Sequence, residues 1–140
     1  MGSEYEQLID YVHESAKEDY ENMASKYWPG ALTMVIPASD NHTTILTSND
    51  LTLGLRIPNS YMAQSLMRET GPVLTSSANI SGFKGSTTVE GIALDFPSLK
   101  ILGPIPWGER SGKASTIIFW KKSGDWRLIR EGEVLVGELY

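Results

Sequence analysis

Apolar residues recur every three or four positions in four segments of this chain, which is the spacing of one buried face of an α-helix. The helices predicted from this spacing are residues 4–14, a helix running from Ser15 to a stop at Pro29-Gly30, Ser60–Thr70, and a helix that opens at Thr87–Glu90. Capping boxes mark two of the starts, at Ser15–Glu18 and at Thr87–Glu90. The residues expected to share a face are Tyr20, Met23, Ala24 and Tyr27 in the second helix, Met62, Ala63, Leu66 and Met67 in the third, and Val89, Ile92, Ala93 and Phe96 in the fourth.

Alternating or short apolar runs predict the strands. In chain order these are Leu32–Ile36, Thr43–Thr47, Leu51–Pro58, Lys100–Leu102, Ser115–Trp120, Arg127–Arg130 and Val134–Leu135. The clearest is Leu51–Pro58, whose leucines share one face with Ile57 while Thr52, Gly54 and Arg56 share the other. Ser115–Trp120 is apolar on both faces, which is typical of a central strand. Helices and strands alternate, so we expect a layered α/β domain.

Charge is unevenly distributed along the 140 residues, whose net charge is −5. Residues 1–55 hold nine acids and two bases, whereas the rest of the chain holds eight acids and ten bases. The second part is therefore the better candidate to face an anionic ligand. No basic stripe is long enough to predict nucleic-acid binding from charge alone. The absence of cysteine excludes disulfides and thiolate metal sites and is typical of a cytoplasmic protein, and no signal or membrane-spanning run is present.

Three segments carry candidate chemistry. Thr75–Gly82 gathers small hydroxyl and amide side chains after a short apolar run, which fits either an ordinary turn or a ligand-binding loop. Arg56 lies on a strand face with little bulk, where it is either solvated or a clamp for a carboxylate or phosphate. Gly108–Ser115 looks like a phosphate loop, but its spacing is one residue short and Ala114 replaces the metal-binding hydroxyl. We therefore expect the segment Gly103–Ala114 to form a plain loop or a lid.

The two histidines, His13 and His42, lie in no catalytic or metal-binding motif. A histidine-driven acid–base mechanism is therefore not expected. An enzyme built from these residues would act mainly by positioning its substrates and by stabilising charge.

Four blocks, in order, resemble the YrdC/Sua5 family over roughly residues 16–135. They are Lys26–Thr33 (KYWPGALT), Gly54–Pro58 (GLRIP), Thr75–Gly82 (TSSANISG), and Ala114–Ile118 (ASTII) followed by Leu128–Gly132 (LIREG). The first and third blocks are similar to the family's Trp-Pro-Gly-Pro and Ser-Ala-Asn-x-Ser-Gly signatures. Ala31 stands where the family usually has proline. The resemblance implies a twisted mixed sheet flanked by helices in a single α/β domain, with a concave, positively charged cavity.

The resemblance also implies a function. Members of this family form threonylcarbamoyl-AMP from L-threonine, bicarbonate and ATP, releasing pyrophosphate, and the product serves the t6A modification of tRNA. By the same resemblance Arg56 would hold the threonine carboxylate, and Ser77 and Thr33 would lie at the threonine and carbamate. Ser77, Asn79, Ser115 and Arg130 would contact the nucleotide. Magnesium would arrive with ATP rather than on protein ligands. Some members bind double-stranded RNA, and a cytoplasmic location is expected.

One departure from the family pattern keeps other functions open. The family opens with a segment that includes a Lys-x-Arg element for the triphosphate, and no Lys-x-Arg occurs in this sequence. We therefore expect residues 4–140 to form the C-terminal two-thirds to three-quarters of the domain, after a cloning remnant at residues 1–3. The alternatives are a non-catalytic module that binds a nucleotide, threonine or RNA, and a structural piece that self-associates through an open sheet edge.

Overall fold

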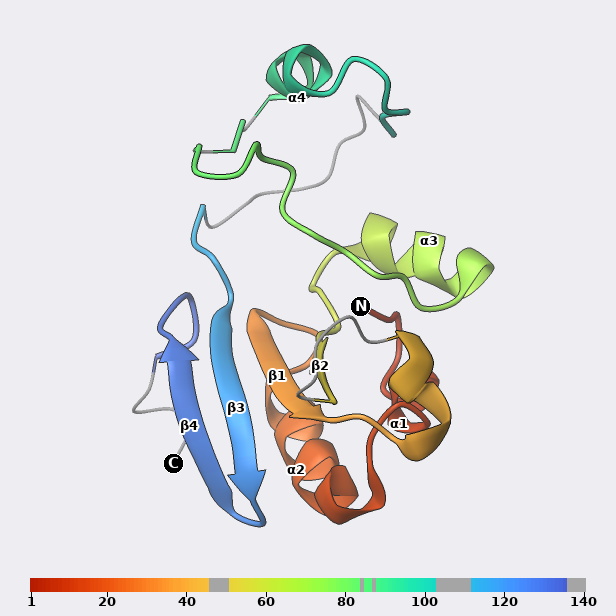
Figure 1. The fold of residues 1–140 in the computed structure, drawn as a ribbon, viewed down its shortest axis with the longest axis vertical. Coiled ribbons are helices and arrows are strands. Elements are labelled where there is room, and N and C mark those ends of the chain that lie inside the picture. The colour runs from red at the N-terminus through yellow and green to blue at the C-terminus, as the bar shows by residue number, and fades with distance from the viewer. Residues whose placement is uncertain (46–50, 84, 87, 103–111, 136–140) are drawn as a thin grey trace. The chain divides into compact units, whose positions relative to one another are not determined.

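The computed structural model describes residues 1–45, 51–83, 85–86, 88–102 and 112–135 (Figure 1). The chain divides into two compact units. The first comprises residues 1–73 and 109–140, and the second comprises residues 74–108. Each unit is described by itself. The predicted loop at 103–114 lies largely outside the described residues.

A mixed four-stranded sheet organises the first unit. Its strands are β1 (Leu32–Pro37), β2 (Thr52–Leu55), β3 (Thr116–Lys122) and β4 (Asp125–Arg130), in the spatial order β2-β1-β3-β4. β1 runs parallel to β3, and the other two pairs are antiparallel. The mixed α/β class is thereby confirmed, and β3 is an inner strand as its apolar pattern predicted.

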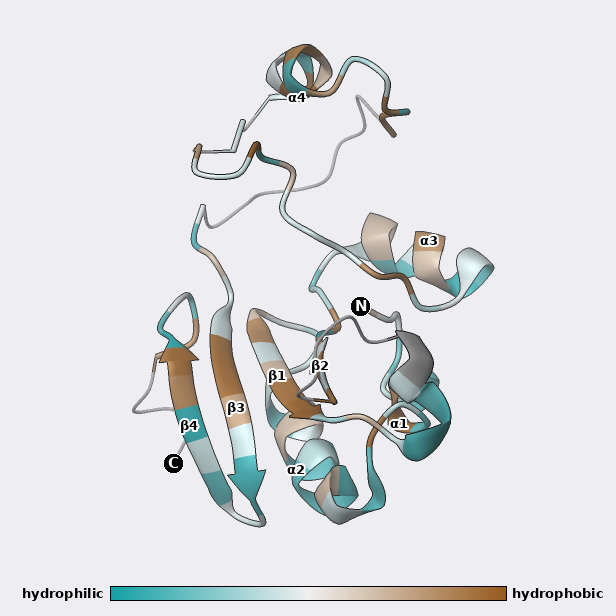
Figure 2. Cartoon of the chain, viewed as in Figure 1, coloured by the Kyte–Doolittle hydropathy of each residue, from teal (hydrophilic) through white to brown (hydrophobic). Residues whose placement is uncertain are grey.

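One face of this sheet forms the core. The inward residues alternate along β1 and β2, and they pack with β3 and with α2 (Lys17–Tyr27). The residues of this cluster from the three strands and from α2 are Leu32, Met34, Ile36, Leu53, Leu55, Ile118, Tyr20, Met23 and Ala24. Figure 2 shows the apolar stretches of β1 and β3 side by side. Because side chains alternate, Thr33, Gly54 and Ser115 belong to the opposite face.

The segment before α2 departs from the predicted helix over residues 4–14. α1 spans only Glu6–Ile9, because Val12 forms a β-bridge with Ala38 and so cannot continue a helix. A 3-10 helix, η1 (Glu14–Ala16), follows, and the His13 side chain accepts the Ser15 backbone N–H at its start. The predicted Ser15–Glu18 capping box is wrong, since α2 begins at Lys17 without a side-chain cap.

Residues 1–3, excluded above from the expected domain, pack into the first unit. The amino group of Met1 donates to the Val73 carbonyl at 2.8 Å, and the Gly2 N–H donates to the Arg56 carbonyl at 3.2 Å. Gly2 and Ser3 are buried. A Cβ at Gly2 would lie 2.8 Å from Leu8 Cγ, so glycine allows the chain to pass close to α1.

Three predicted strands are wrong. Residues 40–45 form a 3-10 helix, η2 (Asp40–Ile45), in which Thr43 Oγ1 bonds the Asp40 carbonyl, and residues 46 and 47 of the predicted strand lie outside the described residues. Lys100–Leu102 and Val134–Leu135 pair with no strand among the described residues. At Val134 the carbonyl instead accepts a side-chain hydroxyl, from Thr116. β2 is shorter than predicted: it begins after Leu51, whose φ is 48°, and it ends at Leu55, before Arg56.

The remaining two helices begin at hydroxyl caps. α3 (Tyr61–Thr70) starts at Ser60, whose Oγ accepts the Ala63 N–H, and ends at Gly71 with a φ of 78°. Its only buried residue is Met67, and Leu66, expected to face the core, is 43% exposed. In the second unit α4 (Val89–Asp95) starts at Thr88, one residue later than predicted, and none of its residues is buried.

Candidate functional site

The topology of the sheet brings four strand ends together. β1 and β3 are parallel, so both begin at the same edge, and their antiparallel neighbours β2 and β4 finish there. Thr33 lies near the start of β1 and Ser115 directly before β3, while Arg56 directly follows β2 and Arg130 ends β4. Four of the six predicted site residues thus gather at one edge of the sheet, although they are up to 97 positions apart in sequence.

Thr33, Ser115 and Arg130 form a connected polar group at this edge. The hydroxyls of Thr33 and Ser115 lie 2.9 Å apart, so one donates to the other. Arg130 donates to the Ser115 carbonyl from Nε at 3.1 Å and from Nη2 at 2.8 Å, and Nη2 also lies 3.2 Å from Ser115 Oγ. Ser115 is buried, whereas Arg130 is exposed. The arrangement offers a hydroxyl and a fixed cation to an incoming anion.

Arg56 is a half-buried cation at the same edge. Its Nε donates to the Gly30 carbonyl at 2.9 Å, which fixes the guanidinium against the segment before β1. Burial lowers the pKa of Arg56, the negative charge of Glu133 opposes this effect, and the positive charge of Arg130 adds to it. The guanidinium nevertheless stays charged, since arginine keeps its proton in proteins. Because burial and the nearby charge of Arg130 both destabilise the charged guanidinium, binding of an anionic ligand would stabilise it.

The Trp28–Thr33 segment supplies the backbone that Arg56 contacts. The Trp28–Pro29 peptide is cis, and the Gly30 N–H donates to the Ile57 carbonyl at 2.9 Å. A Cβ at Gly30 would collide with the Tyr27 carbonyl oxygen, so only glycine fits this position. Trp28 Nε1 donates to the Leu32 carbonyl at 2.7 Å and holds the segment on the start of β1. The Trp-Pro-Gly block is therefore a structural support for Arg56.

Ser77 and Asn79 belong to the second unit. Asn79 Nδ2 donates to the carbonyls of Ile80 and Phe83 at 3.2 and 3.1 Å, and Gly82 has a φ of 83°. These local bonds are those of a Ser/Asn turn. Ser77 is exposed. The assignment of both residues to nucleotide binding stays a prediction.

A buried residue behind the site was missed from the sequence. Thr116, the first residue of β3, is 0% exposed, and its hydroxyl donates to the Val134 carbonyl at 2.6 Å and accepts the Gly132 N–H at 2.9 Å. A threonine at a strand start looks like any β-former, so its pattern gave no signal. The signal that could have found it is the glycine two residues after Arg130, in the Arg-x-Gly block.

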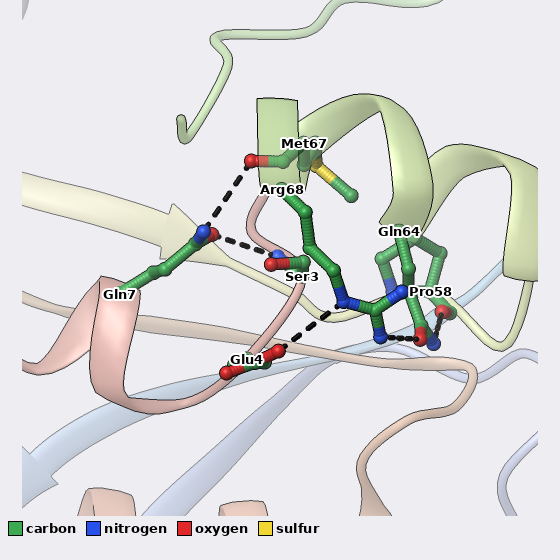
Figure 3. A network of polar contacts seen from close by, with 7 residues as sticks. All are labelled: Ser3, Glu4, Gln7, Pro58, Gln64, Met67 and Arg68. Carbon is green, nitrogen blue, oxygen red and sulfur yellow. Dashed lines mark hydrogen bonds and ion pairs between the residues drawn. The ribbon is translucent and has the colours of Figure 1, made fainter. Parts of the chain in front are cut away.

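None of the predicted site residues lines a cleft of about 520 Å³ in the first unit. Its lining comes from the N-terminal segment, α2, α3 and the segments around Trp28 and Ile57, and it includes Glu4 and Arg68. Figure 3 shows part of its polar wall, where Arg68 Nε meets Glu4 Oε1 at 3.2 Å and Gln64 Nε2 donates to the Pro58 carbonyl at 2.8 Å. Because Arg68 in this cleft is already paired with the Glu4 carboxylate, the cleft is a weaker candidate for anion binding than the strand ends that carry Arg56 and Arg130.

The described residues hold no group of three or more His, Cys, Asp or Glu side chains that could bind a metal ion. No described helix is long and apolar enough to cross a membrane.

The fold and the site define an α/β domain that presents hydroxyls and arginines at one sheet edge, and known proteins share this fold. The Sua5/YciO/YrdC family profile, described as "Telomere recombination", matches residues 1–132. The threonylcarbamoyl-AMP synthase of Pyrococcus abyssi is 35% identical over 116 residues, which are 81% of this chain and 34% of that protein. The synthase of Bacillus subtilis is 33% identical over 74% of this chain and 30% of its own length.

Solved structures agree with these matches. A structure of a variant of P. abyssi Sua5 superposes with a TM-score of 0.82 at 32% identity, covering 99% of this chain and 42% of that one. A crystal structure of P. abyssi Sua5 in complex with L-threonine gives a TM-score of 0.81 at 30% identity, covering 99% and 40%. This chain belongs to the Sua5/YciO/YrdC family. It spans about a third of the length of the two curated relatives named above.

Proposed function

We propose that this chain carries the threonine and nucleotide site of a threonylcarbamoyl-AMP synthase. The observation that supports this most is the convergence of Arg56, Arg130, Thr33 and Ser115 on one sheet edge. The substrates in the proposed reaction are L-threonine, bicarbonate and ATP. Their products are threonylcarbamoyl-AMP, pyrophosphate and water, which balances the atoms.

Arg56 is the proposed partner of the threonine carboxylate. A guanidinium matches a carboxylate with two parallel hydrogen bonds, and the Nε bond to Gly30 already orients its plane. Among the contacts that the structure describes, this bond uses one of the five N–H donors and leaves those of the two Nη nitrogens for a ligand. Thr33 lies one strand away and is the proposed neighbour of the carbamate. A P. abyssi relative has been crystallised with L-threonine, which supports this choice of ligand.

Ser115 and Arg130 are the proposed partners of the nucleotide in the first unit, and Ser77 and Asn79 stay sequence-based candidates for nucleotide binding. The Ser115 hydroxyl and the Arg130 guanidinium can both donate to phosphate oxygens. In this reaction a carbamate oxygen bonds to the α-phosphorus of ATP and the bond to pyrophosphate breaks, so negative charge develops on the leaving group. Fixed cations lower the barrier to such a step. Mg²⁺ would enter on the ATP phosphates.

The missing Lys-x-Arg element sets the expected rate. The loss of one charge-stabilising donor can cost on the order of 10²–10³ in rate. We therefore expect these 140 residues to bind L-threonine and ATP and to form product slowly. The same observation favours the second candidate, a module that binds both ligands without catalysis. Binding of double-stranded RNA is the weaker variant, because a net charge of −5 opposes it.

The experiment is a titration with each of the two ligands, monitored by amide-correlation NMR, and a product assay on the same sample. L-Threonine is expected to shift signals around Arg56 and Thr33, with D-threonine as the matched control that shows no saturable shift. Magnesium-ATP is expected to shift signals of Ser115 and Arg130. Labelled bicarbonate that appears in threonylcarbamoyl-AMP would establish catalysis, and saturable binding without product would favour the binding module. A well-dispersed spectrum that responds to neither ligand would contradict both.

A further inference from the structure

Thr116 connects two parts of the chain that both belong to the proposed nucleotide site. It follows Ser115 directly, and its side chain lies on the buried face of the sheet, where it pairs in register with Leu32. Its backbone N–H donates to the Ala31 carbonyl at 2.9 Å, which links the starts of β1 and β3. Thr116 therefore lies directly behind the candidate site and does not reach its ligand face.

The Thr116 hydroxyl holds the segment that follows Arg130. Its proton goes to the Val134 carbonyl and one lone pair accepts the Gly132 N–H, so both hydrogen-bonding roles of a hydroxyl are used. The two bonds cross 18 and 16 residues. Because the hydroxyl is buried, its removal leaves both part-buried backbone groups without this partner.

The same segment lies unusually close to Ser115. A Cβ built on Gly132 would be 2.6 Å from the Ser115 carbonyl carbon and 2.7 Å from its oxygen. The Glu133 N–H donates to the Ala114 carbonyl at 3.0 Å, which adds a second attachment. Arg130, two residues before Gly132, then donates to the Ser115 carbonyl from Nε and Nη2. Hydrogen bonds therefore fix the backbone of Gly132–Val134 against the backbone around Ser115, the residue that Arg130 contacts.

We propose that Thr116 is a positioning residue that sets the direction of Arg130 and Ser115 toward the nucleotide. It acts through the Gly132–Val134 backbone and touches no ligand itself. This inference rests on the proposed function, because it assumes that Ser115 and Arg130 contact the nucleotide. It predicts that nucleotide binding depends on the Thr116 hydroxyl, whereas threonine binding at Arg56 does not.

The test compares three variants of the full chain. Thr116→Val keeps the shape but loses the hydroxyl, Thr116→Ser keeps the hydroxyl but loses the methyl, and Ile118→Val trims a buried neighbour on β3 that is 2% exposed. Thr116→Val is expected to weaken magnesium-ATP binding about tenfold and L-threonine binding by less than about twofold. Thr116→Ser and Ile118→Val are expected to keep both affinities within about twofold, even where they lower the unfolding midpoint. A Thr116→Val protein that binds ATP like the wild type would overturn the proposal.

A second measurement needs no ligand. In the wild type the Arg130 Nε–H is bonded to the Ser115 carbonyl, so its side-chain NMR signal should exchange slowly with water. Thr116→Val is expected to speed this exchange about tenfold, and Ile118→Val is expected to leave it unchanged. If the wild type binds no ATP, the proposed function fails, and this signal alone decides the role of Thr116: unchanged exchange in Thr116→Val rejects it. If Thr116→Val does not fold, Thr116→Ser decides, because a tenfold loss of ATP affinity there would show that the hydroxyl is not what matters.

Discussion

The two units of the chain differ in how much apolar surface they bury. Every buried hydrophobic residue that the structure describes belongs to the first unit. In the second unit none of the residues of α4 is buried, and Leu94 and Phe83 are 82% and 72% exposed. Regions with few buried apolar contacts open at low free-energy cost. The first unit can therefore hold Arg56, Ser115 and Arg130 in fixed places, whereas the described hydrogen bonds of the Asn79 side chain go only to its near neighbours Ile80 and Phe83.

The largest effect expected from this difference comes from shortening a core side chain. Met34 is 0% exposed in β1, so Met34→Ala should lower the free energy of unfolding by about 2–5 kcal/mol. Ile92 in α4 is only partly buried, and Ile92→Ala should cost less than about 1 kcal/mol. Urea unfolding followed by tryptophan fluorescence measures both. Equal losses in the two variants would remove the distinction between the units.

A helix cap gives a smaller, matched comparison. Ser60 caps α3 in the first unit and Thr88 caps α4 in the second, each by accepting a backbone N–H. Replacing either with alanine should cost its helix about 1 kcal/mol. Ser60→Ala should also lower the unfolding midpoint of the first unit, because α3 is anchored there by buried Met67. Thr88→Ala should instead only speed amide exchange within α4. An equal shift of the unfolding midpoint in Thr88→Ala and Ser60→Ala would contradict the expectation that α4 adds little to the stability of the first unit.

The smallest effect is expected at a surface contact of the first unit. Arg127 lies on β4, the strand that also carries Arg130. Its guanidinium lies 5.3 Å from the centre of the Phe119 ring. Exposed cation–π contacts contribute about 0.5–1 kcal/mol, so Arg127→Gln should lower the free energy of unfolding by roughly that amount. Thermal unfolding checks it. A loss above about 2 kcal/mol would mean that the stability of this unit does not reside mainly in its core.

The sequence predicted the parts of the fold in which each side chain is either clearly buried or clearly exposed. Alternation along β1 and β2 was readable because one face is buried and the other is not. The helix expected over residues 4–14 failed because the Val12–Ala38 bridge, a contact between distant residues, overrides local spacing. Gly2 carried no pattern at all, yet it is buried against Leu8.

The candidate site was predictable only in part. The family resemblance supplied Arg56, Ser115 and Arg130, and the parallel pairing of β1 with β3 explains why they meet. Thr116 was missed because its role depends on contacts with Gly132 and Val134, 16 and 18 residues away, and the glycine of the Arg-x-Gly block is the one sequence feature that marks this segment.

The most direct test of the central claim compares Arg56→Gln with Arg127→Gln. Both replace an arginine of the first unit with the same residue, but only Arg56 lies among the converged strand ends. L-Threonine binding by NMR titration should weaken at least about tenfold in Arg56→Gln, since hydrogen bonds to a charged group are each worth about 1.5–3 kcal/mol. It should stay within about twofold in Arg127→Gln. Equal affinities in the two folded variants would contradict the assignment of this sheet edge as the threonine site.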